Sequence, residues 1–352
     1  MIILGIETTC DETGVGIVED GRKVLSNVVS SSVQLHKKYG GIVPEVAARE
    51  QIKLIVPVTL AALRLARCKF SLIDAVAVSF GPGLVGSLLI GVEAAKTLSL
   101  ALDKPLFIIN HLVGHVYANW LNSYQIPETG RPKFPLVALI VSGGHTDLIL
   151  MSGHDKYRWL GGTRDDSAGE VFDKVARVLG LGYPGGPEIE KIASNFQIRN
   201  PSFDSKLAQG EQSEIRNLKF PRPMISEDNF DFSFAGLKTA VVNLVTRSQL
   251  PQTGHSEIAW EFQNAVVDVL VKKTLKAVKK YKVKTVVVGG GVAANNFLRR
   301  ELMASSSKLG ITVFFPQKDL SVDNGAMIAA AAFFEKNSVN PLKLQADPSL
   351  HF

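Results

Sequence analysis

Two segments of the chain share the same alternation of apolar and polar positions. In the first, the apolar run Ile2–Glu7 is followed by a polar turn and a second apolar run, Gly14–Val18. In the second, Leu136–Val141 leads through the small and polar residues Ser142–Thr146 into Asp147–Met151. Each segment predicts a β-hairpin whose turn carries polar side chains. Because this pattern occurs twice at a wide separation, we expect two related lobes rather than a short-period repeat.

Elsewhere the apolar positions take a helical spacing. Within residues 49–67, one helix face is formed by Ile52, Ile55, Val56, Leu60 and Leu63. Further helices are expected at Val92–Leu102, at Ile258–Lys280 and from Asn295, the last after a strand at Thr285–Val288 and the glycines Gly289–Gly291. A strand, a glycine loop and a helix in this order place backbone N–H groups near a phosphate. Strands that alternate with helices predict an α/β fold.

The composition is that of an ordinary globular protein and bears on the compartment. The 352 residues are 46% hydrophobic and 20% charged, which allows a full core. Two cysteines, Cys10 and Cys68, are too few for a disulfide framework, and the chain opens on a strand rather than a signal peptide. The apolar run Ala326–Phe334 is too short to cross a membrane, and no stretch of about 18 apolar residues is expected. We therefore expect a cytoplasmic protein without a membrane partner.

Two histidines one helical turn apart are the sharpest chemical feature. His111 and His115 follow the apolar run PLFIIN and lie on one face of the helix expected there. Imidazoles at this spacing suit zinc or iron; the alternative is a pair of surface histidines. Asp323 precedes an alanine-rich helix, where it is either the N-cap or a third, carboxylate ligand. The sequence has no HExxH motif, which disfavours a zincin-type peptidase.

Three other segments have features of a nucleotide site, each weak by itself. Asp173 lies beside the apolar side of a predicted helix and is either solvated or a ligand for a ribose hydroxyl. The prolines and glycines of 184–187 predict a tight turn that a ligand can approach closely. Asn295 is a helix cap, a ligand or both. The lysines of 272–280 are expected on a solvated helix face, and the net charge of +6 permits a polyanionic partner without identifying one.

Taken together, the motifs resemble the TsaD family of tRNA threonylcarbamoyltransferases. They extend over nearly the whole chain: Gly5–Thr13, Tyr39–Glu50, Gly81–Gly91, Lys96–Val116, Ile140–Thr146, Asp165–Lys174, the PGGP turn, Phe232–Val241, Gly289–Arg299 and Ser321–Met327. The resemblance implies the α/β fold of the actin, Hsp70 and sugar-kinase (ASKHA) superfamily, with two RNase-H-like lobes around a central cleft. It implies an N-terminal lobe of residues 1–130 with a return helix at about 322–336, a C-terminal lobe of residues 131–321 with an insertion at about 195–231, and a surface tail of residues 337–352.

The resemblance also implies roles for individual residues. The metal ligands are His111, His115 and Asp323, for one divalent ion that is Fe²⁺ by family, with Zn²⁺ as the alternative. The threonylcarbamoyl and phosphate portion of the donor is assigned to Ile140, Val141, Ser142, Gly143 and Gly144, the nucleotide portion to Asp173, Gly186 and Asn295, and a part in activity to the acidic pair Asp11 and Glu12. Three departures from the family's usual residues, Arg164, Ser167 and Gln51 (His in many members), are expected to touch none of these positions.

The implied reaction transfers threonylcarbamoyl from threonylcarbamoyl-AMP to the N6 amine of adenosine 37, in tRNAs that read codons starting with A, and releases AMP. The implied partners are tRNA, this adenylate, a TsaB-like paralogue and a TsaE-like ATPase. Two alternatives stay open. One is an ATPase or phosphotransferase of the same fold, although such enzymes normally hold Mg²⁺ through carboxylates. The other is a non-catalytic scaffold paralogue, although the family's scaffold lacks the histidine pair.

Overall fold

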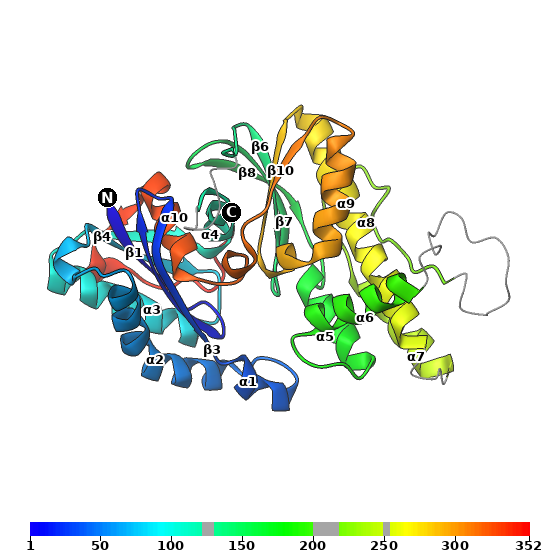
Figure 1. Cartoon of the computed structure of the whole chain (residues 1–352), viewed down its shortest axis with the longest axis horizontal. Helices are drawn as coiled ribbons and strands as arrows, with labels where there is room; N and C mark the ends of the chain where they lie inside the picture. Colours follow the sequence, from blue (N-terminus) through cyan, green and yellow to red (C-terminus); the bar gives the residue numbers. More distant parts are fainter. Residues whose placement is uncertain (122–129, 200–217, 249–253) are drawn as a thin grey trace.

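The fold consists of two units, each a β-sheet covered by helices. The computed structural model describes residues 1–121, 130–199, 218–248 and 254–352. The two units, called here the N-lobe and the C-lobe, lie beside one another along the long axis of the molecule (Figure 1). The α/β architecture of two lobes that the sequence predicts is therefore confirmed.

The N-lobe is built on a six-stranded sheet in the spatial order β11-β5-β4-β1-β2-β3. Its strands are β1 (Ile2–Glu7), β2 (Glu12–Glu19), β3 (Lys23–Ser31), β4 (Ala75–Gly81), β5 (Leu106–Asn110) and β11 (Ser338–Val339). β1 pairs antiparallel with β2, as the hairpin prediction requires, and parallel with β4, which in turn pairs parallel with β5. The loops after β1, β4 and β5 therefore meet at one edge of the sheet, the usual position of a ligand site in α/β proteins.

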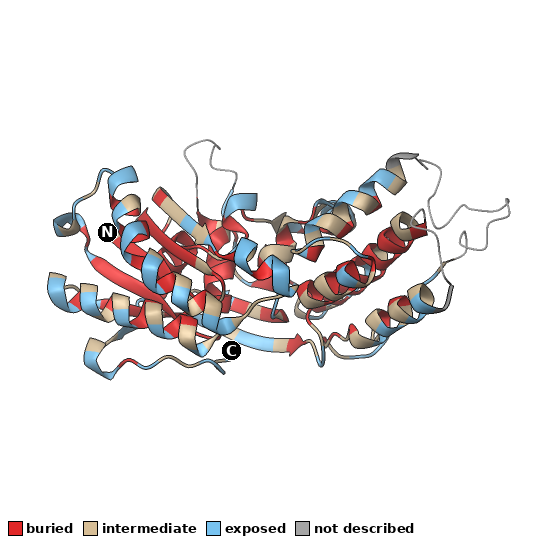
Figure 2. Cartoon of the chain, turned by 90° about the horizontal axis from the view of Figure 1, so that it is seen from below, coloured by how far each residue is buried: buried red, intermediate tan, exposed pale blue. Residues whose placement is uncertain are grey.

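Helices cover both faces of this sheet. They are α2 (Pro44–Leu65), α3 (Val85–Leu102), α4 (His111–Tyr117) and α10 (Gly325–Glu335), whereas the short helix α1 (Val33–His36) follows β3 and does not cover the sheet. Successive side chains of β1 point to opposite faces: Leu4 and Ile6 pack in the core under α2 and α3, whereas Ile3 packs in the core under α4 and α10. Figure 2 shows the strands buried and the outer helix faces exposed.

The expectation that no segment is long and apolar enough for a membrane is wrong for α3. By length and composition alone its 18 residues pass that test, with a mean hydropathy of 1.5. A third of the helix is buried inside the protein, and it packs against α2 and β4. This packing is that of a helix that covers a sheet.

The C-lobe repeats part of this topology around a five-stranded sheet in the order β10-β9-β6-β7-β8. Its strands are β6 (Leu136–Val141), β7 (Thr146–Gly153), β8 (Lys156–Gly162), β9 (Thr285–Gly289) and β10 (Thr312–Phe314). Its helices are α5 (Ala168–Val178), α6 (Gly185–Arg199), α7 (Ala235–Ser248), α8 (His255–Tyr281) and α9 (Asn296–Ser307). β6 pairs antiparallel with β7 and parallel with β9, just as β1 pairs with β2 and β4. The second predicted hairpin is therefore present.

One lysine of α8 contradicts the prediction of a solvated face. Lys273 is fully buried, and its ammonium group donates hydrogen bonds to the backbone oxygens of Glu227 and Asn229, at 3.4 and 3.1 Å, and to Asn229 Oδ1 at 2.9 Å. Burial lowers the pKa of Lys273. The side chain thus anchors the segment before α7 to the long helix, a tertiary role that helical spacing does not reveal.

The predicted insertion and tail differ in detail from expectation. α6 continues to Arg199, beyond the expected start of the insertion at residue 195, and residues 200–217 lie outside the described part of the chain. The tail lies mostly on the surface, with only Leu344 buried, and it also makes specific contacts. β11 pairs with β5, Asp347 N donates to Phe80 O at 2.7 Å, and a ring nitrogen of His351 lies 3.8 Å from Asp147 of the C-lobe. The C-terminal residues therefore touch both lobes.

Candidate functional site

The two histidines of the sequence motif lie at the carboxyl edge of the N-lobe sheet. β5 ends at Asn110, whose side-chain oxygen accepts a hydrogen bond from Leu112 N at 2.8 Å and so caps α4. The helix begins at His111 and places His115 one turn later on the same face. Their ring centroids are 4.6 Å apart.

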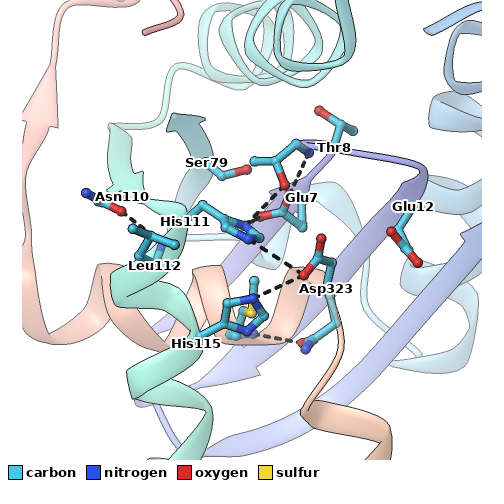
Figure 3. Close-up of polar contacts among 12 residues, drawn as sticks. Glu7, Thr8, Glu12, Ser79, Asn110, His111, Leu112, His115 and Asp323 are labelled. Atoms are coloured by element: carbon cyan, nitrogen blue, oxygen red, sulfur yellow. Dashed lines mark hydrogen bonds and ion pairs between the residues drawn. The ribbon is translucent and has the colours of Figure 1, made fainter. Parts of the chain in front are cut away.

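Asp323 lies beside this pair, in the loop before α10. The N-cap of α10 is Asn324, whose Oδ1 accepts from Met327 N at 3.0 Å, so the interpretation of Asp323 as the cap is wrong. The carboxylate of Asp323 instead points at the two imidazoles (Figure 3): its Oδ1 lies 3.1 Å from His115 Nε2 and 3.6 Å from His111 Nε2. One ligand atom from each residue lies within 4.8 Å of the others.

The chemistry of these three residues fits a divalent metal ion. His115 is fully buried, and apart from the 3.1 Å ion-pair contact of Nε2 with Asp323 no polar partner is found for its ring nitrogens within the described part of the chain. Buried polar atoms normally have a partner, and a metal ion held between His111, His115 and Asp323 would supply one. Two imidazoles and a carboxylate form a donor set that iron and zinc accept. Although burial alone would raise it, the neighbouring His111 and His115 lower the pKa of Asp323 to about 2, so the carboxylate is ionised as a ligand must be.

A buried carboxylate that sequence reasoning missed orients His111. Glu7, the last residue of β1, is fully buried, and its Oε2 lies 2.9 Å from His111 Nδ1 (Figure 3). Thr9 Oγ1 lies 3.2 Å from the same nitrogen, and Thr9 N donates to Glu7 Oε1 at 2.6 Å. With Nδ1 held in this way, Nε2 faces Asp323. The only signal in the sequence is an acidic residue at the end of an otherwise apolar strand.

The carboxylates around His111 favour positive charge at this position. Burial by itself would lower the pKa of His111, yet Glu7 and Asp323 raise it to about 9. A site that holds a proton this strongly also favours a metal cation in the proton's place.

A cleft of about 700 Å³ lies in front of this centre. It is lined from the N-lobe by residues of the β1–β2 turn, of 40–42 and of 82–84, and from the C-lobe by residues of 142–145, of α5 and of 183–184. The acidic pair Asp11 and Glu12 belongs to this lining, together with Asp323. Burial, with Asp323 and Asp11 nearby, raises the pKa of Glu12 well above its usual range. The structure thus brings the acidic turn, His111 and Asp323 into one cavity.

The glycine segment after β6 faces them from the C-lobe. Ser142, Gly143 and Gly144 line the cleft, and a Cβ added to either glycine would meet no atom within 4 Å. The main chain is therefore open to a ligand. Ile140 and Val141 are fully buried in the core and do not line the cleft, so any contribution they make is through the strand that carries the loop.

The three residues predicted for the nucleotide portion are placed differently. Asp173 lines the cleft; burial raises its pKa, and its Oδ1 accepts a hydrogen bond from Gly185 N at 2.7 Å. Gly185 begins α6, so the expected tight turn at 184–187 is the start of a helix, and a Cβ at Gly186 would meet open space. Asn295 caps α9 through Leu298 N at 2.9 Å, donates to Gln263 and is not among the residues that line the cleft.

Two of the departures from the family pattern do touch matched positions, contrary to expectation. Ser167 caps α5, and its hydroxyl donates to Gly143 O at 2.6 Å. Gln51 donates to the backbone of the acidic turn, including Glu12 O at 2.8 Å. Arg164 pairs with Asp231 instead.

Further cleft residues were not predicted from the sequence. His145 lines the cleft, and burial, with His111 and His115 nearby, lowers its pKa to about 4, so the imidazole is neutral. Lys174 and Arg177 of α5 also line the cleft, one turn apart. Both lie after Asp173 on the same helix. In the sequence, such basic residues look the same whether the helix face is exposed to solvent or lines a cleft.

Comparisons with known proteins agree with this geometry. The family model of tRNA N6-adenosine threonylcarbamoyltransferase (TsaD) matches residues 23–330. The protein of that name from Moorella thermoacetica is 47% identical over 352 residues, which cover 99% of this chain and 96% of the relative. The one from Thermosipho africanus is 46% identical and covers 99% of both chains.

Solved structures show the same fold at low identity. Full-length HypF in its phosphate- and nucleotide-bound form gives a TM-score of 0.56 at 15% identity, over 94% of this chain and 46% of that one. Component A of (R)-2-hydroxyglutaryl-CoA dehydratase from Acidaminococcus fermentans gives 0.50 at 13% identity, over 95% and 98%. These likenesses concern the two-lobed α/β fold alone. The match to the family model and the full-length identity to its members go further, and by them the chain belongs to the TsaD family of tRNA N6-adenosine threonylcarbamoyltransferases.

Proposed function

We propose that the cleft holds threonylcarbamoyl-AMP between the centre formed by His111, His115 and Asp323 and the glycine loop, and presents it to N6 of adenosine 37 in tRNA. The reaction is the transfer that its family performs. The observation that supports this arrangement is that His111 and Asp323 of one lobe and the open main chain at Gly143 and Gly144 of the other line the same cleft. The phosphate and the carbonyl of threonylcarbamoyl-AMP can therefore each find polar groups of the protein, on the N-lobe side or on the C-lobe side of the cleft.

The proposed resident metal is one divalent ion, Fe²⁺ by family, with Zn²⁺ as the alternative. When bound, such an ion polarises an oxygen of the donor. The protein's own residues supply the rest. The backbone N–H groups of Gly143 and Gly144 donate to negative charge that develops on the donor, and the α5 residues Asp173 and Arg177 line the part of the cleft proposed for the nucleotide.

The acceptor amine is a poor nucleophile because its lone pair is delocalised into the purine ring. In the proposed step a bond forms between N6 and the carbamoyl carbon, the bond from that carbon to the phosphate oxygen breaks, and AMP leaves. The amine loses one proton, for which Glu12 is the proposed acceptor, because it lines the cleft and burial raises its pKa, so that it holds a proton more readily than an exposed glutamate does. Asp11 is proposed to order the same turn. The target base leaves its single-stranded loop to enter the cleft, at a cost of about a few kcal/mol.

Single alanine substitutions of the metal-ligand residues test this proposal. Purified His111→Ala and His115→Ala proteins are compared with wild type for bound metal and for transfer from synthetic threonylcarbamoyl-AMP to tRNA. We expect both variants to lose the metal and to transfer at least about 100-fold more slowly. His255→Ala, at the start of α8 and not among the residues that line the cleft, is the matched control. Full transfer by a metal-free histidine variant contradicts the ligand assignment, and wild-type protein that modifies no tRNA while it consumes threonylcarbamoyl-AMP contradicts the reaction.

A TsaB-like paralogue and a TsaE-like ATPase are the proposed protein partners, and the cytoplasm is the proposed compartment. Large apolar side chains exposed on neighbouring α2 and α3 support a protein partner: Ile52, Val56, Leu60, Val85 and Leu89. Both cysteines are free, which agrees with a reducing compartment. Mixing experiments with purified candidates by analytical ultracentrifugation test the partners, and Val56→Asp is expected to weaken the complex.

A further inference from the structure

Gln51 makes an unusual set of contacts behind the acidic turn. The residue lies on the inner face of α2 and is 1% exposed. Its side-chain Nε2 donates to three backbone oxygens of one short segment: Thr8 O at 3.3 Å, Cys10 O at 3.1 Å and Glu12 O at 2.8 Å. One buried amide therefore spans the whole turn between β1 and β2.

The orientation of this amide follows from its surroundings. If the amide were turned over, Oε1 would face three carbonyl oxygens, all of them acceptors. In the observed orientation Nε2 faces them, and Oε1 has no hydrogen-bond partner in the described part of the chain. A buried acceptor is thus left unsatisfied while three carbonyls share the amide. Buried polar groups are rarely left unpaired, so the unpaired Oε1 has an energetic cost. We infer that the hydrogen bonds from Nε2 to the turn offset this cost.

Other contacts hold single points of the same turn. Ser87 Oγ donates to Cys10 O at 3.0 Å, and Ser32 donates to Asp11 O through its backbone N and its Oγ. Each of these contacts fixes one carbonyl. Gln51 alone among the described side chains bonds to three separated carbonyls of this turn, and so sets its curvature.

We infer that Gln51 is a positioning residue for the reaction, because it holds the backbone from which Asp11 and Glu12 project into the cleft. The inference rests on the proposed role of that acidic pair. Gln51 does not line the cleft, so it acts through the turn and not on the substrate. Loss of the amide donor should therefore slow the transfer step while leaving donor binding and metal binding in place.

Three substitutions separate the donor from the bulk of the side chain. Gln51→Leu removes every hydrogen bond, Gln51→Glu keeps the shape but sets a carboxylate against three carbonyls, and Gln51→His restores an N–H donor. Thr59→Val on the same helix is the control, because Thr59 is also buried and bonds only to Ile55 O of its own helix. For each variant we measure kcat, KM for threonylcarbamoyl-AMP, bound metal and Tm.

We expect kcat to fall on the order of 100-fold in Gln51→Leu and further in Gln51→Glu, with KM and metal content within about twofold of wild type. Gln51→His should recover most of kcat, and Thr59→Val should lower Tm without changing kcat. Wild-type kcat in Gln51→Leu overturns the inference, as does a loss of kcat that merely follows Tm across all four variants.

Glu12→Gln and Asp11→Asn, measured in parallel, separate this inference from the proposed function. If they are slow while Gln51→Leu is fully active, the acidic pair keeps its role and Gln51 loses its own. If both acid variants are fully active, the role of the turn and the inference about Gln51 are rejected together, whereas the metal assignment is unaffected.

Discussion

His111 lies between two carboxylates, and each has a different task. Glu7 holds Nδ1 from within the core, whereas Asp323 faces Nε2 from the loop before α10. The imidazole therefore cannot rotate without breaking a buried contact. At the residue scale, the orientation of His111 depends on Glu7, a carboxylate that contacts Nδ1 and not the Nε2 side of the ring, where Asp323 lies.

Replacing Glu7 tests that dependence. Glu7→Gln keeps the shape of the side chain but removes its charge, so Nδ1 of His111 loses its charged partner and the ring is oriented less firmly. We expect metal affinity, measured by competition with a chromogenic chelator, to fall about 10- to 100-fold. Glu45→Gln, on the exposed surface of α2, should bind metal as wild type does. Unchanged affinity in Glu7→Gln would show that the buried carboxylate plays no part in ligand orientation.

Glu335 gives a prediction about pH that is independent of the site. Burial, with Asp155 nearby, raises its pKa from 4.5 to about 8. Between these values the folded protein holds a proton that the unfolded chain has lost, so stability contributed by this group falls as pH rises from 4.5 to 8.

Glu335→Gln cannot titrate and should escape this loss. Relative to wild type, the variant should be about equally stable near pH 4.5 and more stable above pH 8, with a gain on the order of 1 kcal/mol for each pH unit between. Urea unfolding of both proteins near pH 4.5 and above pH 8 measures this difference in unfolding free energy. A stability difference that does not change with pH would contradict the prediction.

The sequence predicted some residues of the site and could not predict others. Helical spacing alone places His111 and His115 on one face, and that prediction holds. Glu7 and Gln51 could not be predicted, because each acts through a residue on another element, 104 positions away for Glu7 and 39 for Gln51. Asp323 was left between two interpretations until the structure identified Asn324 as the cap.

At the scale of elements, α10 lies unusually close to the N-lobe sheet. A Cβ on Gly5, Gly14 or Gly16 would overlap the backbone of the segment Asn324–Ala329. Glycines in β1 and β2 therefore let the helix approach, and this approach brings Asp323 to the histidines. In a strand glycine is costly unless another backbone comes close, which is the case here.

Gly16→Ala should push α10 away from the sheet. The added methyl group overlaps backbone atoms of Ala326, which cannot rotate away as a side chain can. We expect a loss of about 1–3 kcal/mol of unfolding free energy, measured by urea denaturation, together with weaker metal binding. Gly153→Ala, whose methyl would make only an ordinary contact with Lys156, is the control. Equal stability of the two variants would contradict the close-approach argument.

Several elements could be predicted from their apolar spacing, although the face expected for α2 is wrong in part, because Ile52, Val56 and Leu60 are exposed and only Ile55 and Leu63 are buried. Both hairpins and the long helix α8 lie where the pattern put them. The start of α3 was predicted at Val92, but the helix begins at Val85. The prediction was wrong because Gly86 and Gly91 weaken the helical pattern of this first part. Gly91 is needed because a Cβ there would overlap Thr8 Oγ1, a contact with another element that no local pattern reveals.

At the scale of the whole molecule, the C-terminal tail links the lobes beside the cleft. Asp347 N bonds to Phe80 O, Gly83 N bonds to Pro348 O, and His351 approaches Asp147 of the C-lobe. Pro82, Gly83 and Leu84 also line the cleft. The tail therefore supports a cleft wall from outside.

Deleting residues 347–352 should loosen this wall while leaving the metal-ligand residues untouched. We expect KM for threonylcarbamoyl-AMP to rise about tenfold, equivalent to about 1.4 kcal/mol, with bound metal unchanged. Leu342→Ala, an exposed position in the same tail, should behave as wild type. Wild-type KM in the truncated protein would mean that the tail does not shape the cleft.

The central claim is that one divalent ion, held by His111, His115 and Asp323, is required for transfer. The most direct test is a titration: metal is removed from the purified protein by chelation, Fe²⁺ or Zn²⁺ is added back anaerobically in steps, and transfer to tRNA is measured against bound metal at each step. The account predicts that activity rises linearly and stops rising at one ion per chain, and that Asp323→Asn shows no such rise. Full transfer by the metal-free protein would contradict it.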